Sequence, residues 1–416
     1  MNRLILVGNG FDLAHDLETS YKDFIDDFWE EKINVIKNSD INSRYEDKYV
    51  IVYNVPNSYP AESIFKTYQD LIKHIPKLII KNKFLELLSK KRTDLNWVDI
   101  ENEYYNELKK TKNINELNSD FEEIKNLLEN YLLKIEKEIS INEKISNNIF
   151  LDFHIKDFLS KAINTFSEPI INKCKSLIEF EHSAAFHSFH PNLKYFIRNI
   201  NTLNQIDANN FIFEHFDKLG DSKKLIEKFQ PEKTLFLNFN YTNTITDYIK
   251  EIKGNNINYL DYNISEIHIH GELNNPENPI IFGFGDDVDK KYQEFEDLND
   301  NRYLENFKSI AYLQTDNYKK LLEFIDSEEY QVFIFGHSCG ISDRTMLNTI
   351  FEHDNCKSIK PFYHRKKDDK GNYIVDDFGN FIDNYTEIVQ NISRNFNDKK
   401  KYRDRVVNKT YCEPLT

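Results

Sequence analysis

Near its start the chain reads Leu4-Ile5-Leu6-Val7-Gly8-Asn9-Gly10-Phe11-Asp12, an apolar run that ends in a glycine turn. Four consecutive apolar residues are typical of a buried strand, and the mixed polar and apolar residues that follow are typical of a helix start. Glycine lets a ligand approach the backbone closely, and the unpaired N–H groups of a first helical turn attract an anion. The stretch therefore predicts a strand, a tight turn and a helix N-terminus that suit a phosphate group.

The glycine turn matches part of a dinucleotide fingerprint. The complete pattern is Gly-x-Gly-x-x-Gly, and Leu13 stands at its third glycine position. Two interpretations stay open on this stretch alone. It is a nucleotide-binding turn, or it is a buried first strand followed by an ordinary glycine turn of an α/β domain.

The composition is that of a globular protein with a large interior. The chain has 416 residues, of which 40% are hydrophobic, with 24 tyrosines and 32 phenylalanines. The net charge of −15 disfavours a protein that coats nucleic acid, because such a protein needs a concentrated basic surface. The basic run 399–405 is expected to be a solvated helix face or tail, with contact to an acidic partner as the alternative.

The cysteines and the apolar segments predict the compartment. Cys174, Cys339, Cys356 and Cys412 show no C-x-x-C spacing, so the sequence indicates neither a zinc ribbon nor a disulfide framework. Scattered reduced thiols fit a cytosolic protein. No apolar run approaches the roughly 20 residues that cross a bilayer, and the N-terminal run is too short for a signal peptide. We therefore expect a cytoplasmic protein without a membrane partner.

Residues 33–232 separate the first strand unit from the rest of the predicted sheet. Lysine, glutamate, asparagine, leucine and isoleucine dominate this stretch, and several segments keep the spacing of amphipathic helices. We predict an all-helical insertion domain over 33–232 within an α/β core formed by 1–32 and 233–416. The end of the core, about 364–416, is expected to contain two hairpin-like turns and a tail.

Two later buried strands also run into polar residues. The stretch 234–239 continues into Asn240-Tyr241-Thr242, and 331–335 continues into Gly336-His337-Ser338. Ligand sites of α/β proteins lie at the carboxyl edge of the strands, so these polar residues are candidates for one site. Asp343 belongs to the predicted cap of the next helix.

A further strand is predicted over 266–273, where His268 and His270 alternate with isoleucines and share one face. Two histidines at this spacing are compatible with a metal site. They are equally compatible with one buried, hydrogen-bonded histidine beside one working histidine at the strand end. Short strands are also expected from Pro279 onward and over 358–363.

The stretch 96–105 reads Asn-Trp-Val-Asp-Ile-Glu-Asn-Glu-Tyr-Tyr and, as a helix, places a carboxylate beside aromatic rings. A core-facing aromatic stripe with solvated acids explains this pattern. The alternative is a carboxylate aimed into the nucleotide pocket, for which Asp99 and Glu101 are the candidates.

Four short motifs follow one another along the chain: Gly8-Asn9-Gly10-Phe11-Asp12, Asn238-Phe239-Asn240-Tyr241-Thr242, His268-Ile269-His270-Gly271 and Gly336-His337-Ser338. In this order they resemble the AbiH family of bacterial phage abortive-infection proteins. Trp97-Val98-Asp99-Ile100-Glu101 is similar to an internal motif of that family. The resemblance spans nearly the whole chain and implies a role in defence against phage.

AbiH-type proteins in turn resemble the sirtuin-like fold, a Rossmann-type sheet that binds NAD. This resemblance implies that the first glycine turn holds the dinucleotide phosphates and that Asn240 lies beside the nicotinamide ribose. It implies that His270 is the general base and that the Gly336 loop holds the adenosine side. The predicted cofactor-binding residues are Gly8, Asn9, Gly10, Phe11, Asp12, Thr242, Gly336, His337, Ser338 and Asp343, and the predicted catalytic residues are Asn240 and His270.

Thr242 departs from the sirtuin pattern, which has an acid at that position. The contact to the nicotinamide ribose that the acid supplies is then expected from Asp12, Asp99 or Glu101. The chain also lacks a four-cysteine zinc module, so the resemblance does not extend to the protein deacetylases.

The reaction that this resemblance implies is cleavage of the nicotinamide–ribosyl bond of NAD, which serves as substrate or ligand, with no metal expected. An imidazole titrates near neutrality and suits the base role of His270. One alternative is a non-catalytic sensor of NAD or ADP-ribose that acts through a partner. Another is a metal-dependent nuclease that uses His268, His270 and Asp286. The expected partners are a phage-derived trigger, a partner defence protein or further copies of the chain.

Overall fold

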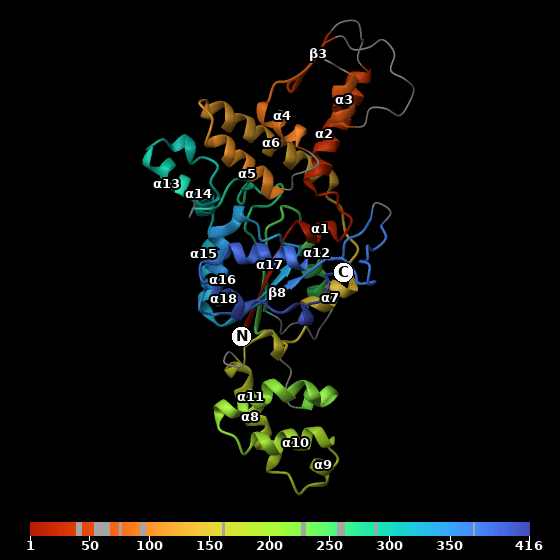
Figure 1. Cartoon of the computed structure of the whole chain (residues 1–416), viewed down its shortest axis with the longest axis vertical. Helices are drawn as coiled ribbons and strands as arrows, with labels where there is room; N and C mark the ends of the chain where they lie inside the picture. Colours follow the sequence, from red (N-terminus) through yellow and green to blue (C-terminus); the bar gives the residue numbers. More distant parts are fainter. Residues whose placement is uncertain are drawn as a thin grey trace.

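A five-stranded parallel sheet forms the centre of the molecule (Figure 1). The computed structural model describes residues 1–38, 44–53, 67–74, 77–91, 97–159, 163–225, 230–255, 263–287, 290–368 and 371–416. Across the sheet the strands are β6 (Asn263–His268), β5 (Lys233–Asn238), β1 (Asn2–Val7), β7 (Tyr330–Phe335) and β8 (Cys356–Phe362). Counted along the chain, this is the order 3-2-1-4-5 of a Rossmann-type sheet, so the predicted fold class is confirmed.

Alternate residues of the strands enter two apolar cores, one on each face of the sheet. In β1, Leu4 and Leu6 enter one core, and Ile5 and Val7 enter the other. The first core is completed by α15 (Asn317–Ser327), α16 (Arg344–Glu352) and α17 (Tyr385–Arg394), and the second by α7 (Glu143–Ile149) and α12 (Thr244–Asn255). A parallel sheet that is buried on both faces requires unbroken apolar strands, which is why the four-residue run at the start of the chain predicted β1 correctly.

Most of the chain between β1 and β5 lies in two lobes at opposite ends of the molecule (Figure 1). The upper lobe comprises α2 (Tyr21–Asn38), α3 (Tyr68–His74), α4 (Lys83–Lys90), α5 (Trp97–Leu108) and α6 (Ile114–Ile135). It also contains an antiparallel sheet of β2 (Arg44–Glu46), β3 (Val50–Tyr53) and β4 (Leu78–Ile80). The inserted chain is therefore mainly helical rather than wholly helical.

The lower lobe has an apolar core of its own. It comprises η1 (Ile155–Asp157), α8 (Asn164–Ile178), α9 (Ala184–His187), α10 (Pro191–Ile200), α11 (Gln205–His215) and η3 (Phe216–Leu225). Met1 joins this core, which places the lower lobe at the amino ends of the strands. The upper lobe and the lower lobe thus lie at opposite edges of the sheet, and only the upper lobe is beside the carboxyl edge.

The connection from β6 to β7 differs from the sequence prediction. β6 ends at His268, because the chain turns at Gly271, whose φ is +88°. The predicted strand from Pro279 onward is irregular backbone, and Phe282 and Phe284 from this segment pack into the core of the upper lobe. The connection continues through α13 (Lys290–Asp297), η5 (Asn301–Tyr303), α14 (Lys308–Ala311) and η6 (Tyr312–Gln314).

The C-terminal part follows the predicted pattern of turns. Gly371 and Gly379 adopt φ values of +83° and +81°, and antiparallel bridges flank both turns. The basic run 399–405 forms α18 (Lys399–Arg405), in which Lys401 and Arg405 donate to carbonyl groups at the end of α16. Cations at a helix C-terminus satisfy unpaired carbonyls and the negative end of the dipole, so part of this run has an internal structural role. The last element is η8 (Lys409–Tyr411).

Candidate functional site

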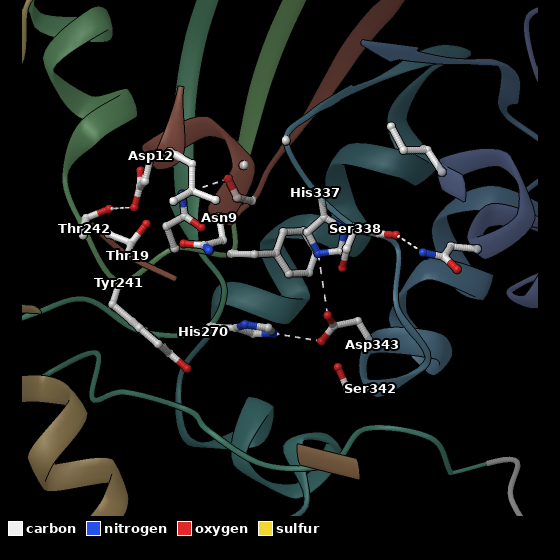
Figure 2. A pocket seen from close by; sticks show the side chains of 18 of the residues that line it. Asn9, Asp12, Thr19, Tyr241, Thr242, His270, His337, Ser338, Ser342 and Asp343 are labelled. Atoms are coloured by element: carbon white, nitrogen blue, oxygen red, sulfur yellow. Dashed lines mark hydrogen bonds and ion pairs between the residues drawn. The ribbon is translucent and has the colours of Figure 1, made fainter. Parts of the chain in front are cut away.

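A cavity of about 380 Å³ lies at the carboxyl edge of the central sheet. Its wall is built from the turns after β1, β5, β6 and β7, with further side chains from the upper lobe and from the C-terminal part. The cavity lies where the strand order reverses, between β1 and β7, which is the usual ligand position in a sheet of this type. Figure 2 shows the polar side chains that converge on it.

The glycines of two turns allow those turns to pack directly against each other. Gly336, with φ +71°, lies so close to the first turn that a Cβ there would be 2.1 Å from the backbone nitrogen of Phe11. A Cβ on Gly8 would be 2.5 Å from Cα of His337, and a Cβ on Gly10 would be 2.8 Å from the carbonyl oxygen of Gly336. The glycines thus fix the cavity wall by close backbone contact.

Most amides of the first turn are used within the protein. Gly8 N–H donates to Phe335, Gly10 N–H to Gly336 and Phe11 N–H to Gly8, each at a backbone carbonyl. The N–H of Asn9, the first residue of the short helix α1 (Asn9–Leu13), lines the cavity and makes no hydrogen bond to a described residue. An anion over this turn therefore finds the Asn9 N–H available, whereas the Gly8, Gly10 and Phe11 amides are already paired.

Asp12 and Thr242 meet on one side of the cavity. The Thr242 hydroxyl donates to Asp12 Oδ2 at 2.6 Å, and only 1% of Asp12 is exposed. Burial raises the pKa of Asp12 to about 6, against the lowering effect of hydrogen bonds from Thr242, Thr244 and Asn240. Of the three acids expected to take the place of the missing one, Asp12 is thus the one that lies in contact with Thr242.

Asn240 links the turns after β1 and β5. Its Nδ2 donates to the carbonyl of Gly8 at 3.1 Å, and its backbone N–H donates to Asn238 Oδ1 at 3.0 Å. Asn240 is buried and lines the cavity, so its side chain both positions the glycine turn and forms part of the wall.

Asp343 is the centre of the other polar group of the cavity (Figure 2). His270 Nε2 lies 3.2 Å from Asp343 Oδ1, Lys308 Nζ lies 2.8 Å from the same oxygen, and His337 Nε2 lies 3.6 Å from Oδ2. The predicted cap position is correct, since Asp343 is the N-cap residue of α16, but its side chain makes no capping hydrogen bond. The carboxylate is turned toward the cavity instead.

The hydrogen bonds assign different roles to the two histidines. His270 Nε2 lies 3.0 Å from the Tyr312 hydroxyl and 3.2 Å from Asp343 Oδ1. A lone pair at Nε2 would be repelled by the Asp343 carboxylate, so Nε2 carries the proton and Nδ1 is the basic nitrogen. His337 Nδ1 accepts a hydrogen bond from the Cys339 N–H at 3.0 Å, which leaves its Nε2–H toward Asp343. His270 therefore retains a nitrogen that can accept a proton, whereas both nitrogens of His337 are engaged.

The charges of this group shift its pKa values. Burial lowers the pKa of His270 to about 4, and the Lys308 charge acts in the same direction, against Asp343. Burial acts to raise the pKa of Asp343, but Lys308 and His270 hold it well below its usual range. At neutral pH the group contains a neutral imidazole beside a carboxylate.

Glu101 brings the upper lobe into the cavity wall. Its Oε1 lies 2.8 Å from Lys308 Nζ and accepts a hydrogen bond from the Gly283 N–H. Burial raises the pKa of Glu101 to about 7, with Lys308 lowering it and the Asp343 charge raising it. Of the two predicted pocket acids, Glu101 is in the pocket, while the side chain of Asp99 lies outside the described residues.

His268, at the end of β6, and His270, two residues beyond it, have different surroundings. His268 is partly buried beside Glu266, with Nε2 3.0 Å from Oε1, and does not line the cavity, whereas His270 does. Asp286, named in the nuclease alternative, pairs with Arg344 at 3.3 Å. Within the described part of the chain, no group of three or more His, Cys, Asp or Glu residues could hold a metal ion.

A third polar group lies at the end of the cavity beside β8 and α17. His364, Asn384, Glu387 and Asn391 line this end. Asn384 Oδ1 accepts from the His364 N–H at 2.8 Å, and Asn391 Nδ2 donates to the Ser338 carbonyl at 2.9 Å. The helix α17 therefore holds the turn after β7 in place while contributing its own side chains to the wall.

The family model for bacteriophage abortive infection AbiH matches residues 4–365. The chain belongs to the AbiH family. Searches of the curated proteins and of the solved structures returned no match. Membership of the AbiH family confirms the resemblance seen in the four motifs and places the protein in abortive infection, a defence against phage. The likeness to the sirtuin fold stays a prediction.

The AbiH motifs come together at one site. Of the residues predicted to bind or to act on a dinucleotide, those at the cavity are Gly8, Asn9, Gly10, Asp12, Asn240, Thr242, His270, Gly336, His337, Ser338 and Asp343. Phe11 is not among them, because its ring packs into the core against Tyr248 and Phe335. None of the described helices combines the length and the apolar character that crossing a bilayer requires.

Sequence reasoning missed Lys308 and the α17 side of the wall. Lys308 follows an irregular segment and is a single lysine among many in the chain, so no local pattern marks it as buried. Asn384, Glu387 and Asn391 recur at helical spacing, but such a polar stripe is normally a solvated face.

Proposed function

We propose that this AbiH protein binds NAD in the cavity and hydrolyses the bond between nicotinamide and ribose. One observation carries the proposal: a buried carboxylate and a buried histidine line the same cavity, at the point where the strand order reverses. The histidine has a basic nitrogen that is not engaged by the described part of the protein. Asp12 provides the carboxylate, and His270, oriented by Asp343, provides the nitrogen.

The chemistry requires few groups from the protein. The C1′–N bond breaks with its electron pair going to the pyridinium nitrogen, so nicotinamide leaves as a neutral molecule without a general acid. Positive charge then develops on the ribose, and a buried carboxylate stabilises it more strongly than one in water. Asp12 is suited to this role because the Thr242 hydroxyl holds its orientation.

Water completes the reaction at C1′. His270 Nδ1 accepts a proton from the attacking water, and the products are ADP-ribose, nicotinamide and one proton released to solvent. The Asp343 carboxylate, 3.2 Å from Nε2, supports this step because it stabilises the imidazolium that forms.

Nicotinamide release by purified protein tests the proposal, with NAD content of expressing cells under phage challenge as the second readout. We expect His270→Ala to abolish release while the far-UV circular dichroism spectrum stays unchanged. His182→Ala, which removes an exposed histidine of the lower lobe, is the matched control and should release nicotinamide like the wild type. Unchanged release by His270→Ala would refute the assignment of the base.

A non-catalytic sensor is the second candidate, and one observation favours it. A histidine with a pKa of about 4 is a weak base, so the unliganded cavity is poorly prepared to activate water. A sensor binds NAD or ADP-ribose and transmits that event to a partner. Tight binding of NAD without turnover in phage-challenged cells, and equal NAD content in wild-type and His270→Ala cells, would establish the sensor over the hydrolase.

A further inference from the structure

The cavity has a polar end that the proposed reaction does not use. It lies beside β8 and α17, on the opposite side of β1 from the turns after β5 and β6 that carry Asn240 and His270. A dinucleotide whose pyrophosphate lies over the β1 turn must place one nucleoside on each side of β1. With the reacting ribose at His270, the second nucleoside lies toward β8 and α17.

Two side chains at this end, Glu387 and Asn384, have polar atoms that make no hydrogen bond to a described residue. Glu387 is exposed, and its carboxylate makes no hydrogen bond or ion pair to a described residue; its charge acts on the neighbouring His364, whose pKa it raises against the lowering by burial. Asn384 uses its Oδ1 on the His364 N–H, which leaves its Nδ2 as a donor. Asn391, by contrast, is occupied by Ser338 through its Nδ2 and by Arg394 through its Oδ1.

The chemistry of this pair selects hydroxyl groups. An ionised carboxylate only accepts hydrogen bonds, and its two oxygens match the two donors of a ribose 2′,3′-diol. The adjacent amide donor of Asn384 can bond to a hydroxyl oxygen of the same diol. A phosphate on the 2′ position carries negative charge and would be repelled by Glu387.

The charge of the rest of the wall supports the same selection. Among the described residues that line the cavity, Lys308 is the one lysine or arginine. It lies with the His270 group and is paired with both Glu101 and Asp343. No described lysine or arginine therefore lines the α17 end of the cavity to neutralise a 2′-phosphate. Sites that bind phosphorylated dinucleotides have an arginine for this purpose.

We propose that Glu387, with Asn384, reads the free 2′,3′-diol of the second ribose and makes the cavity select NAD over its 2′-phosphorylated form. This inference rests on the proposed function for the presence of a dinucleotide. It adds a specificity-determining residue that no sequence motif marks, contributed by a helix beyond the last strand of the sheet.

Isothermal titration calorimetry with ADP-ribose and with 2′-phospho-ADP-ribose tests the inference. Neither probe contains nicotinamide, so the proposed reaction cannot consume them. We expect the wild type to bind ADP-ribose at least about tenfold more tightly than the 2′-phosphate. In Glu387→Gln we expect this ratio to fall by about tenfold, mainly through tighter binding of the 2′-phosphate.

The controls separate this inference from the proposed function. Glutamine is as suitable as glutamate at the third position of α17, so Glu387→Gln keeps the helix start. Asp377→Asn removes one exposed charge outside the cavity and should leave the ratio unchanged. Equal wild-type affinity for the two probes, or an unchanged ratio in Glu387→Gln, overturns the inference alone. If neither probe binds, the dinucleotide site itself is overturned, and the inference with it.

Discussion

Asp12→Asn is expected to make the protein inactive and, at pH 8, more stable. The raised pKa means that ionised Asp12 is unfavourable in the folded state. A carboxyl group with a raised pKa contributes stability below its ordinary pKa of 3.8, and this contribution is lost as the pH rises through about 6. At about 1.4 kcal/mol for each pH unit, the full difference is about 3 kcal/mol. Asparagine has nearly the same shape and carries no charge at any pH.

The size of the effect can be stated for a practical range. Between pH 8 and pH 5, linkage gives the wild type a gain of about 1.4 kcal/mol in the free energy of unfolding. The asparagine variant has no such gain, so its advantage over the wild type should shrink by that amount as the pH falls. Urea unfolding followed by circular dichroism measures both proteins at each pH, and Asp377→Asn, which removes an exposed charge, serves as the control.

Two results would refute this reasoning. A stability difference between Asp12→Asn and the wild type that does not change with pH would mean that the carboxyl group is not desolvated. Wild-type nicotinamide release by Asp12→Asn would remove Asp12 from the proposed chemistry, whatever its pKa. Gain of stability with loss of activity is the expected pattern, because charged groups at active sites are commonly kept at a cost in stability.

Two further substitutions test the construction of the cavity wall. Lys308→Met should destabilise the fold by about 3–5 kcal/mol, because it leaves the two buried carboxylates of Glu101 and Asp343 without their cation. The loss is measured as a lower midpoint of thermal unfolding, and an unchanged midpoint would show that these ion pairs are not buried. Gly336→Ala should cost more than the roughly 1 kcal/mol typical of a strained turn, because its methyl group would lie 2.1 Å from the nitrogen of Phe11. Gly371→Ala, with a similar φ and open space around it, is the comparison and should cost only the backbone strain, so equal losses would contradict the close contact.

His268 and His270 show what an alternating sequence pattern can and cannot predict. Alternation along the chain placed His268 and His270 on one face of a predicted strand, and the sequence left their roles open. The structure separates them, because β6 ends at His268 and the turn at Gly271 carries His270 into the cavity. A periodic pattern identifies a face of an element, but it does not say where the element ends.

The sequence by itself determined the sheet and the turns that build the site. Unbroken apolar runs are required for parallel strands buried on both faces, and the polar residues that follow such strands meet at one edge. Only the tertiary structure decided which charges meet there. Lys308 and Glu101 are 207 positions apart and join across the upper lobe, and Glu387 reaches the cavity from a helix beyond the last strand. Contacts between distant segments depend on how the elements pack, and neither periodicity nor a short motif records that packing.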